Sequence, residues 1–276
     1  MNWQIVSVWL LLTLLHSHVN SQQRIYGGHK IDITEAPYMV GVTVIRTPDP
    51  QPGQKVEVYN CGGTILRKNL ILTAAHCNTN GSYDNIYPAG NYYITVGANT
   101  NELSDGVLHY VKKVNVHPEY KGGHEHHFFH DVAVLELTEE IELNDKAQLT
   151  ELAESGDKAP VGTPVVVKGW GVNPDHNNDN HLYAVELDVI SAKECIEKVA
   201  GGKVEDVEKH QICAFAPGKS HCEGDSGGPL IDTKINRQVG IVSYGAVDCT
   251  LGKPDIYTRV TDVLDFINGI IEEASG

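Results

Sequence analysis

The stretch "SHCEGDSGGPL", residues 220–230, raises the question that decides the fold of this chain. Its serine, Ser226, lies among glycines, and a serine in such a stretch is usually part of a turn. The pattern Gly224-x-Ser226-x-Gly228 also fits a nucleophile elbow, in which the serine attacks a carbonyl carbon. A serine hydroxyl is a poor nucleophile at neutral pH, and it needs an imidazole, usually oriented by a carboxylate, to accept its proton. The interpretation of Ser226 therefore depends on the histidines and carboxylates in the rest of the chain.

The histidines of the chain all precede Ser226. A nucleophile elbow followed by an acid and then a histidine is therefore excluded. In "LTAAHC", residues 72–77, His76 ends an apolar strand, and in "HDVAVLEL", residues 130–137, Asp131 precedes a strand that is apolar enough to be buried. A buried carboxylate needs a partner, and an imidazolium would serve. We expect His76, Asp131 and Ser226 to meet in the folded chain.

Short apolar or alternating runs recur along the chain between turn signals. Such runs predict an all-β sandwich or a pair of barrels. They cover residues 38–45, 64–75, 92–98, 107–116, 132–137, 164–170, 182–190, 238–244 and 256–260. The C-terminal stretch "DVLDFINGII" differs, because its apolar residues repeat at helical spacing, and it predicts a terminal helix.

The N-terminal 21 residues carry no Asp, Glu, Lys or Arg and contain the apolar run 5–15. This run is too short to span a bilayer, and it predicts a secretory signal peptide over residues 1–21. In a secreted chain the six cysteines predict disulfides rather than a metal cluster, and the sequence leaves their pairing open at this point. The formal net charge of −15 argues against nucleic acid as a partner.

Five motifs occur in an order that carries a resemblance. They are "IYGG" (25–28), "LTAAHC", "HDVAVLEL", "GWG" (169–171) and "GDSGGP" (224–229). With these motifs the chain resembles the chymotrypsin-fold (S1) family of serine proteases from Ile25 to near the C-terminus. The resemblance implies an all-β fold of two packed six-stranded Greek-key β-barrels, with the active site between them and a C-terminal α-helix. The protease domain would cover residues 25–276, with barrel one at about 25–142, barrel two at about 143–261 and the helix at about 262–272.

The resemblance also implies an activity and a role for each candidate residue. The chain would be a serine-type endopeptidase that hydrolyses proteins through an acyl-enzyme. Ser226 would be the nucleophile, His76 the general base and acid, and Asp131 the residue that orients His76. The N–H groups of Gly224 and Ser226 would form the oxyanion hole.

Activation is implied by the stretch "SQQRIYGG", in which Arg24 precedes Ile25. The freed amine of Ile25 would pair with Asp225 and order the oxyanion loop. The chain would thus be a zymogen with a propeptide of residues 22–24 and a trypsin-like activator. The resemblance also implies three disulfides, which are Cys61–Cys77, Cys195–Cys213 and Cys222–Cys249.

Four residues are implied as the substrate-binding pocket: Ser220 at its base, Ser243 and Gly245 on its wall, and Asp255, where many relatives carry glycine. An enclosed carboxylate favours a cationic side chain unless it is neutralised. Asp255 could thus select arginine or lysine at P1, the residue before the cleaved bond. It could instead narrow the pocket, or be neutralised by His221, and give chymotrypsin-like or mixed specificity. Both alternatives stay open.

The expected partners are protein or peptide substrates, protein inhibitors and the activating protease. The expected state is a secreted, extracellular monomer without cofactor, metal or membrane contact. The histidine-rich stretch "HEHHFFHD" (124–131) nevertheless leaves zinc binding open, and Asn80 begins a glycosylation sequon. The alternative to an enzyme is a catalytically silent homologue that binds or regulates. Such homologues usually lose a triad residue, and here His76, Asp131 and Ser226 are all present.

Overall fold

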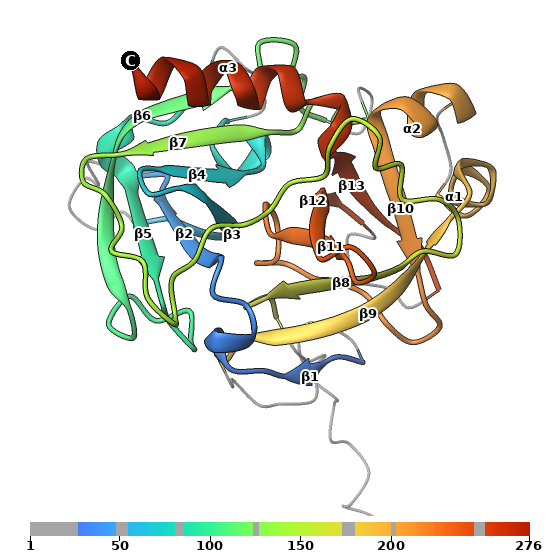
Figure 1. Ribbon diagram of the computed structural model, residues 1–276, viewed down its shortest axis with the longest axis horizontal. Helices are drawn as coiled ribbons and strands as arrows, with labels where there is room; N and C mark the ends of the chain where they lie inside the picture. Colours follow the sequence, from blue (N-terminus) through green and yellow to red (C-terminus); the bar gives the residue numbers. More distant parts are fainter. Residues whose placement is uncertain are drawn as a thin grey trace, which may run out of the picture.

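Two closed antiparallel β-barrels lie side by side in the computed structural model of the chain (Figure 1). The structure describes residues 27–47, 55–80, 85–123, 127–172, 180–199, 203–245 and 252–276. The predicted all-β class, with two six-stranded barrels and a C-terminal helix, is confirmed. The predicted signal peptide (1–21), the propeptide (22–24), and Arg24 with Ile25 lie outside the described residues.

Barrel one comes from the N-terminal half of the chain. Its strands are β2 (Met39–Ile45), β3 (Val58–Arg67), β4 (Leu70–Thr73), β5 (Tyr92–Val96), β6 (Val107–Val116) and β7 (Ala133–Leu137). They close in the order β2-β3-β4-β7-β6-β5, and β5 pairs back to β2. Along β2, Val40, Val42 and Val44 are all buried, because alternate residues of a strand point to the same face.

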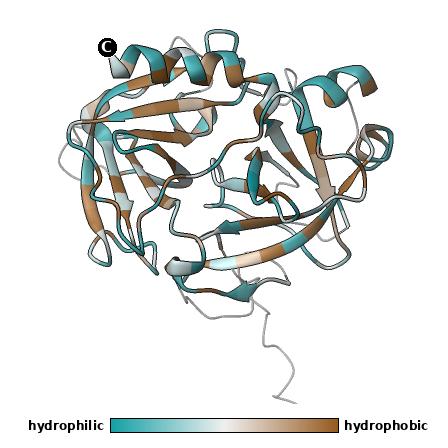
Figure 2. Cartoon of the chain, viewed as in Figure 1, coloured by the Kyte–Doolittle hydropathy of each residue, from teal (hydrophilic) through white to brown (hydrophobic). Residues whose placement is uncertain are grey.

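Barrel two repeats this connectivity. Its strands are β8 (Pro164–Gly169), β9 (Tyr183–Ile190), β10 (Gln211–Phe215), β11 (Pro229–Asp232), β12 (Arg237–Tyr244) and β13 (Asp255–Arg259). They close in the order β8-β9-β10-β13-β12-β11, which is the order of barrel one shifted by six strands. Figure 2 shows hydrophobic residues on strands of both barrels. Burial alternates along β8, as in a half-buried strand, whereas β4 and β11 are buried along their whole length.

The first described strand and the last helix each pack on the barrel formed by the other half of the sequence. The short strand β1 (His29–Lys30) pairs with β9 of barrel two. The C-terminal helix α3 (Leu264–Ser275) lies over barrel one, where the ring of Phe266 is 4.9 Å from the ring of His117 (Figure 1). β1 and α3 therefore tie the barrels to each other.

The C-terminal helix differs from its predicted range of about 262–272. It begins two residues later, because Val260–Asp262 form the 3-10 helix η5. It continues to Ser275, since Ile271 and Ala274 extend its apolar face against the core and no proline interrupts it.

The remaining helices are short. They are α1 (Ala192–Lys198), α2 (Val204–His210), η1 (Ile33–Glu35), η2 (Ala75–Cys77) and η3 (Ala89–Asn91). None of these was predicted, because elements of three to seven residues cannot show a helical repeat in the sequence. No described helix is long and apolar enough to cross a membrane.

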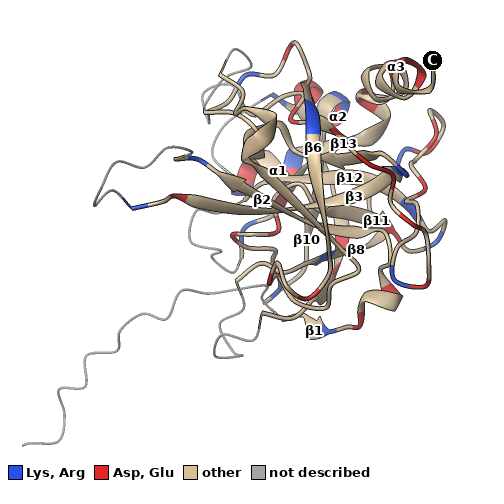
Figure 3. Cartoon of the chain, turned by 90° about the vertical axis from the view of Figure 1, so that its left-hand side faces the viewer, with Lys and Arg blue, Asp and Glu red and all other residues tan. Residues whose placement is uncertain are grey.

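Charged residues of both signs are spread over barrel one. Figure 3 shows Asp and Glu interspersed with Lys and Arg on the side that it presents. Nζ of Lys113 on β6 lies 3.6 Å from Oε2 of Glu273 on α3. This ion pair is a further contact between the terminal helix and barrel one. Exposed pairs of this kind add little stability, so the apolar face of α3 accounts for most of its attachment.

Two disulfides of the described residues are pairs that the resemblance implies. Cys61–Cys77 joins β3 to η2, and Cys195–Cys213 joins α1 to β10. Cys222 is also disulfide-bonded, and its expected partner, Cys249, lies outside the described residues. Each bond stabilises the fold by on the order of 3 kcal/mol, mainly by constraining the unfolded chain.

Candidate active site

Two neighbouring strands of barrel one bring His76 and Asp131 together. β4 and β7 are antiparallel partners, with Thr73 opposite Ala133, so the residues after β4 lie beside those before β7. Nδ1 of His76 is 2.8 Å from Oδ2 of Asp131, and the main-chain N–H of His76 donates to Oδ1 over 2.8 Å. A carboxylate only accepts hydrogen bonds, so Nδ1 carries the proton and Nε2 of the neutral ring is an acceptor.

Asp131 is fully buried and has partners from both barrels. Its Oδ2 accepts a hydrogen bond of 2.5 Å from the hydroxyl of Ser243 on β12. Its main-chain oxygen accepts a hydrogen bond of 3.1 Å from the hydroxyl of Thr258 on β13. The sequence analysis placed Ser243 only on the pocket wall and missed Thr258. Both lie more than 100 residues from Asp131 in the chain, and no local pattern links them to it.

Ser226 lies on the loop before β11, and its main chain reaches barrel one. Its carbonyl oxygen accepts a hydrogen bond of 2.7 Å from the N–H of Gly62 on β3. Sγ of Cys77 lies 3.8 Å from that oxygen and 3.8 Å from Nε2 of His76. The structure therefore brings the loop of Ser226 to the same place as His76 and Asp131, where the two barrels meet.

Two glycines beside Ser226 are required by geometry. Gly227 has a φ of +79°, and a Cβ there would clash with the hydroxyl of Thr73. Gly224 has a φ of +98°, and a Cβ there would lie 3.1 Å from Cα of Gly171. Within the described part of the chain, neither the N–H of Gly224 nor that of Ser226 donates to another main-chain group. Both donors are therefore available to the oxygen of a ligand.

Asp225 is a fully buried carboxylate next to Ser226. It accepts hydrogen bonds from the N–H groups of Cys222, over 2.9 Å, and of Gly171, over 2.8 Å. A Cβ on Gly171 would overlap this carboxylate, so glycine is needed at that position. Burial raises the pKa of Asp225 to about 6, against the opposing effects of these two donors and of His221.

Ser220 and Asp255, which were both expected in the substrate-binding pocket, contact each other. The hydroxyl of Ser220 donates to Oδ1 of Asp255 over 2.8 Å, and the main-chain N–H of His221 donates to Oδ2 over 3.0 Å. The hydroxyl of Tyr257 lies 3.5 Å from the same Oδ2. Asp255 is only 2% exposed, and its burial raises the pKa of the carboxyl group, while His221 and these donors act to lower it.

The imidazole ring of His221 lies beside the carboxylate of Asp255. Its Nε2 is 3.7 Å from Oδ1 of Asp255, and its ring packs edge-on against the ring of Tyr257, with centroids 5.6 Å apart. Both ring nitrogens are buried, without a hydrogen-bond partner among the residues that the structure describes. A Cβ on Gly245 would lie 3.1 Å from Oδ1 of Asp255 and 3.3 Å from Cε1 of His221. The imidazole and the carboxylate thus fill the space between the pocket base and Gly245.

The stretch before Asp131 reaches the site through Phe128. Its ring lies edge-on to the ring of His76, at 6.4 Å between centroids, and 5.2 Å from the ring of Tyr244. The sequence predicts that Phe128 lines the pocket next to the scissile site. The structure places it beside His76, where it adds an apolar wall.

A cavity of about 270 Å³ opens beside Gly224 and extends along barrel one, with Cys61 and Glu223 among its lining residues. The cavity therefore adjoins Gly224, one of the two residues whose N–H groups were expected to form the oxyanion hole.

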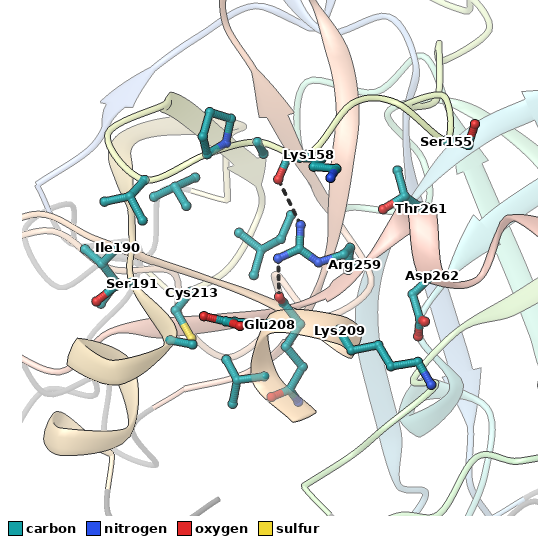
Figure 4. Close-up of a pocket in the computed structure, with 18 residues that line it drawn as sticks. Ser155, Lys158, Ile190, Ser191, Glu208, Lys209, Cys213, Arg259, Thr261 and Asp262 are labelled. Atoms are coloured by element: carbon teal, nitrogen blue, oxygen red, sulfur yellow. Dashed lines mark hydrogen bonds between the residues drawn. The ribbon is translucent and has the colours of Figure 1, made fainter. Parts of the chain in front are cut away.

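A larger cavity of about 630 Å³ lies in barrel two and is lined by none of the three expected triad residues. Figure 4 shows Arg259 at its centre, where the guanidinium donates to the carbonyls of Lys158, over 3.0 Å, and Gln211, over 2.7 Å. Two main-chain oxygens thus hold the terminal nitrogens of this guanidinium in place.

Similarity to known proteins covers almost the whole described chain. The family model described as Trypsin matches residues 25–267. The chain is 32% identical over 257 residues to Trypsin 5G1 of Aedes aegypti, covering 91% of this chain and 86% of that protein. It is 30% identical over 248 residues to a vitellin-degrading protease of Bombyx mori, covering 89% and 84%. It is 32% identical over 266 residues to mast cell protease 3 of Ovis aries, covering 94% of each.

Proposed function

The chain belongs to the trypsin family of serine endopeptidases, and we propose that His76, Asp131 and Ser226 carry out its catalysis. The observation that supports these roles most is the pair of hydrogen bonds from His76 to the buried carboxylate of Asp131. They fix the ring and leave Nε2 as a proton acceptor. The main chain of Ser226 lies against the sulfur of Cys77, which is also near that nitrogen.

The proposed reaction is peptide hydrolysis through an acyl-enzyme. Nε2 of His76 accepts the proton of Ser226 as Oγ attacks the scissile carbonyl carbon. The N–H groups of Gly224 and Ser226 stabilise the charge on the carbonyl oxygen. Loss of one such donor typically lowers kcat by about 10²–10³. His76 then donates its proton to the leaving amine as the C–N bond breaks. A water deprotonated by His76 hydrolyses the ester and frees Ser226.

The chain is also proposed to be a zymogen that is activated by cleavage between Arg24 and Ile25. The new amine of Ile25 would pair with Asp225, whose carboxyl group has a raised pKa because it is buried. An ammonium group at that point favours the ionised carboxylate and holds the neighbouring loop. Gly224, one residue before Asp225, would thereby be fixed as an oxyanion donor.

Labelling with a fluorophosphonate probe tests catalysis and activation together. We expect the chain cleaved after Arg24 to react at Ser226 at least about 100-fold faster than the uncleaved chain, because the probe needs the same oxyanion donors as the substrate. The matched control is Ser226→Ala, which should remain unlabelled in both forms. A folded, cleaved chain that does not react at Ser226 would instead support a silent homologue that binds or regulates.

For the primary specificity, the proposal is an uncharged P1 residue, such as leucine or an aromatic residue, rather than arginine or lysine. Both oxygens of Asp255 accept hydrogen bonds, and the side chain is almost fully buried. A P1 guanidinium would have to displace the ring of His221 to reach it. Displacement exposes a buried carboxylate and breaks its contacts, so an uncharged side chain above the ring is favoured.

Replacing the ring tests this specificity. His221→Ser opens the space over Asp255, and we expect the ratio of kcat/KM for P1 arginine to that for P1 leucine to rise about tenfold or more. The measurement is a cleavage-site profile of a peptide library with the activated enzyme. The matched control, Ser220→Ala, keeps the ring and should keep the preference for uncharged P1 residues. Wild-type cleavage mainly after arginine or lysine would overturn the proposal and make self-activation at Arg24 feasible.

An uncharged P1 preference requires a separate trypsin-like activator for the bond after Arg24. With the predicted signal peptide, this supports a secreted, extracellular enzyme that acts on protein substrates and meets protein inhibitors outside the cell. Its proposed state is the monomer that the resemblance implies. Analytical ultracentrifugation of the secreted protein should give the mass of one chain.

A further inference from the structure

A second group of chemistry-bearing side chains lies next to Asp131 and takes no part in the proposed catalysis. It consists of His117, Glu119 and His130 from barrel one and His210 and Asp262 from the other half of the chain. We propose that His130, His210 and Asp262 bind a zinc ion, with Glu119 and His117 at its edge. This site does not depend on the catalytic roles proposed above.

The distances suit zinc. Bonds of about 2.0–2.1 Å to nitrogen and oxygen place the ligand atoms of a tetrahedral zinc about 3.3–3.4 Å apart. Nδ1 of His210 lies 2.7 Å from Oδ2 of Asp262, and Nε2 of His130 lies 3.8 Å from the same oxygen. All three ligand atoms lie within 4.8 Å of one another. The two printed distances lie on either side of the tetrahedral spacing.

The charge state also suits a metal. The side chains of His130, His210 and Asp262 are 19%, 13% and 12% exposed. Zinc binds the uncharged form of imidazole, and the carboxylate of Asp262 supplies negative charge at the same point.

The backbone around His130 has an unfavourable conformation, and this supports a specific role for the segment in metal binding. His127, Phe128 and His130 have φ of +52°, +48° and +57°, a conformation that costs free energy in residues other than glycine. His117 and His130 stack with ring centroids 4.6 Å apart, and the rings of His130 and His210 are 5.0 Å apart. The two groups share His130, so its imidazole lies between the carboxylates of Glu119 and Asp262.

Access to the site is available through Asp262. This residue also lines the open cavity of Figure 4, on the same margin as Lys209. A hydrated ion can therefore reach the carboxylate from solvent. By contrast, the other nearby group, Cys61, His76 and Cys77, offers no thiolate, because its cysteines form a disulfide.

The consequence of zinc binding is a link between the two halves of the molecule. His130 immediately precedes Asp131 in barrel one, whereas His210 ends α2 and Asp262 ends η5 beside barrel two. An ion held by all three would fix the strained backbone before Asp131 and join the barrels at that point. Zinc should therefore raise the thermal stability of the protein.

The experiment uses the full chain carrying Ser226→Ala, which prevents autolysis, after removal of metals with EDTA. The probe is zinc chloride alone, with the binding constant from isothermal titration calorimetry and the melting temperature from calorimetry. We expect one zinc per chain and a rise in Tm of roughly 5 °C at a zinc concentration about 100 times Kd. Cobalt in place of zinc should give the visible absorption of a tetrahedral nitrogen and oxygen site.

Variants locate the ion. His210→Gln and Asp262→Asn are each expected to weaken zinc binding at least about tenfold and to remove most of the rise in Tm. The matched control is His29→Gln, at a half-exposed histidine on β1, which should bind like the parent. Circular dichroism without metal checks that each variant is folded, and two variants guard against the failure of one. No zinc-dependent rise in the parent, or an equal rise in all variants, would overturn the proposal. The second outcome would place the ion elsewhere, for instance at His124 and His126, which lie outside the described residues.

Discussion

Asp131→Asn is expected to lower kcat of the activated enzyme by about 10⁴, the size that this change has in other members of the family, with little change in KM. The geometry gives the reason. Oδ1 of Asp131 accepts the main-chain N–H of His76, so an asparagine would keep its oxygen there and turn its amide nitrogen toward Nδ1. The ring would then place its proton on Nε2 and could no longer accept one from Ser226.

A control separates this tautomer effect from the loss of one hydrogen bond. Ser243→Ala removes the hydroxyl that donates to Oδ2 of Asp131 but leaves the carboxylate and His76 unchanged. We expect it to lower kcat by about 10- to 100-fold, in line with the loss of one hydrogen bond to a charged group. Steady-state kinetics on an ester and an amide substrate measure both variants. Activity of Asp131→Asn within tenfold of the wild type would contradict the assigned role.

The second large effect concerns Asp225→Asn, which is expected to leave the chain folded but to keep it at least about 100-fold less active after cleavage at Arg24. An asparagine cannot form an ion pair with the amine of Ile25. The loop would then not hold Gly224 as an oxyanion donor, and each lost donor costs about 10²–10³ in rate. The measurement is kcat/KM of the cleaved variant, with Asp145→Asn, at an exposed loop position, as the matched control. Activity within tenfold of the wild type would exclude the proposed ion pair.

The same substitution has a pH signature in the uncleaved chain. Folding raises the pKa of Asp225 from 3.8 to about 6, so between these values the folded state binds more protons than the unfolded state. The free energy of unfolding should therefore fall as pH rises through this window, by about 3 kcal/mol in total, and then stay level with respect to this group. Asp225→Asn should remove that part of the slope. Urea unfolding from pH 4 to pH 7 measures it, and equal slopes in both proteins would contradict the raised pKa.

The fold, and the contact of His76 with Asp131, could be predicted from the sequence because their signals are local. His76 and Asp131 each lie at the end of an apolar strand, and the glycines around Ser226 mark a turn that only glycine can form. Strand alternation predicted most of the strands, although it did not show that the same connectivity occurs twice, because strand order is a property of long-range pairing.

What the sequence could not predict depends on side chains far apart in the chain. Ser243 and Thr258 meet Asp131 only because β12 and β13 close barrel two against the first barrel. The position of the His221 ring over Asp255 depends on a side-chain orientation that no spacing reveals. The sequence showed only that His221 follows Ser220, the residue expected at the pocket base. Neutralisation of Asp255 by His221 was therefore one of the alternatives that stayed open.

The packing of β1 and α3 on opposite halves sets an order in time during synthesis. Strand β1 precedes the other described strands, but its partner β9 is translated only later. Barrel one has all its strands once β7 is complete, yet α3, the helix that covers it, is translated only after barrel two. Neither half therefore gains its full set of contacts as a separate nascent unit. The stability of this protein arises late and cooperatively, once β1 and α3 have both docked on the opposite half of the molecule.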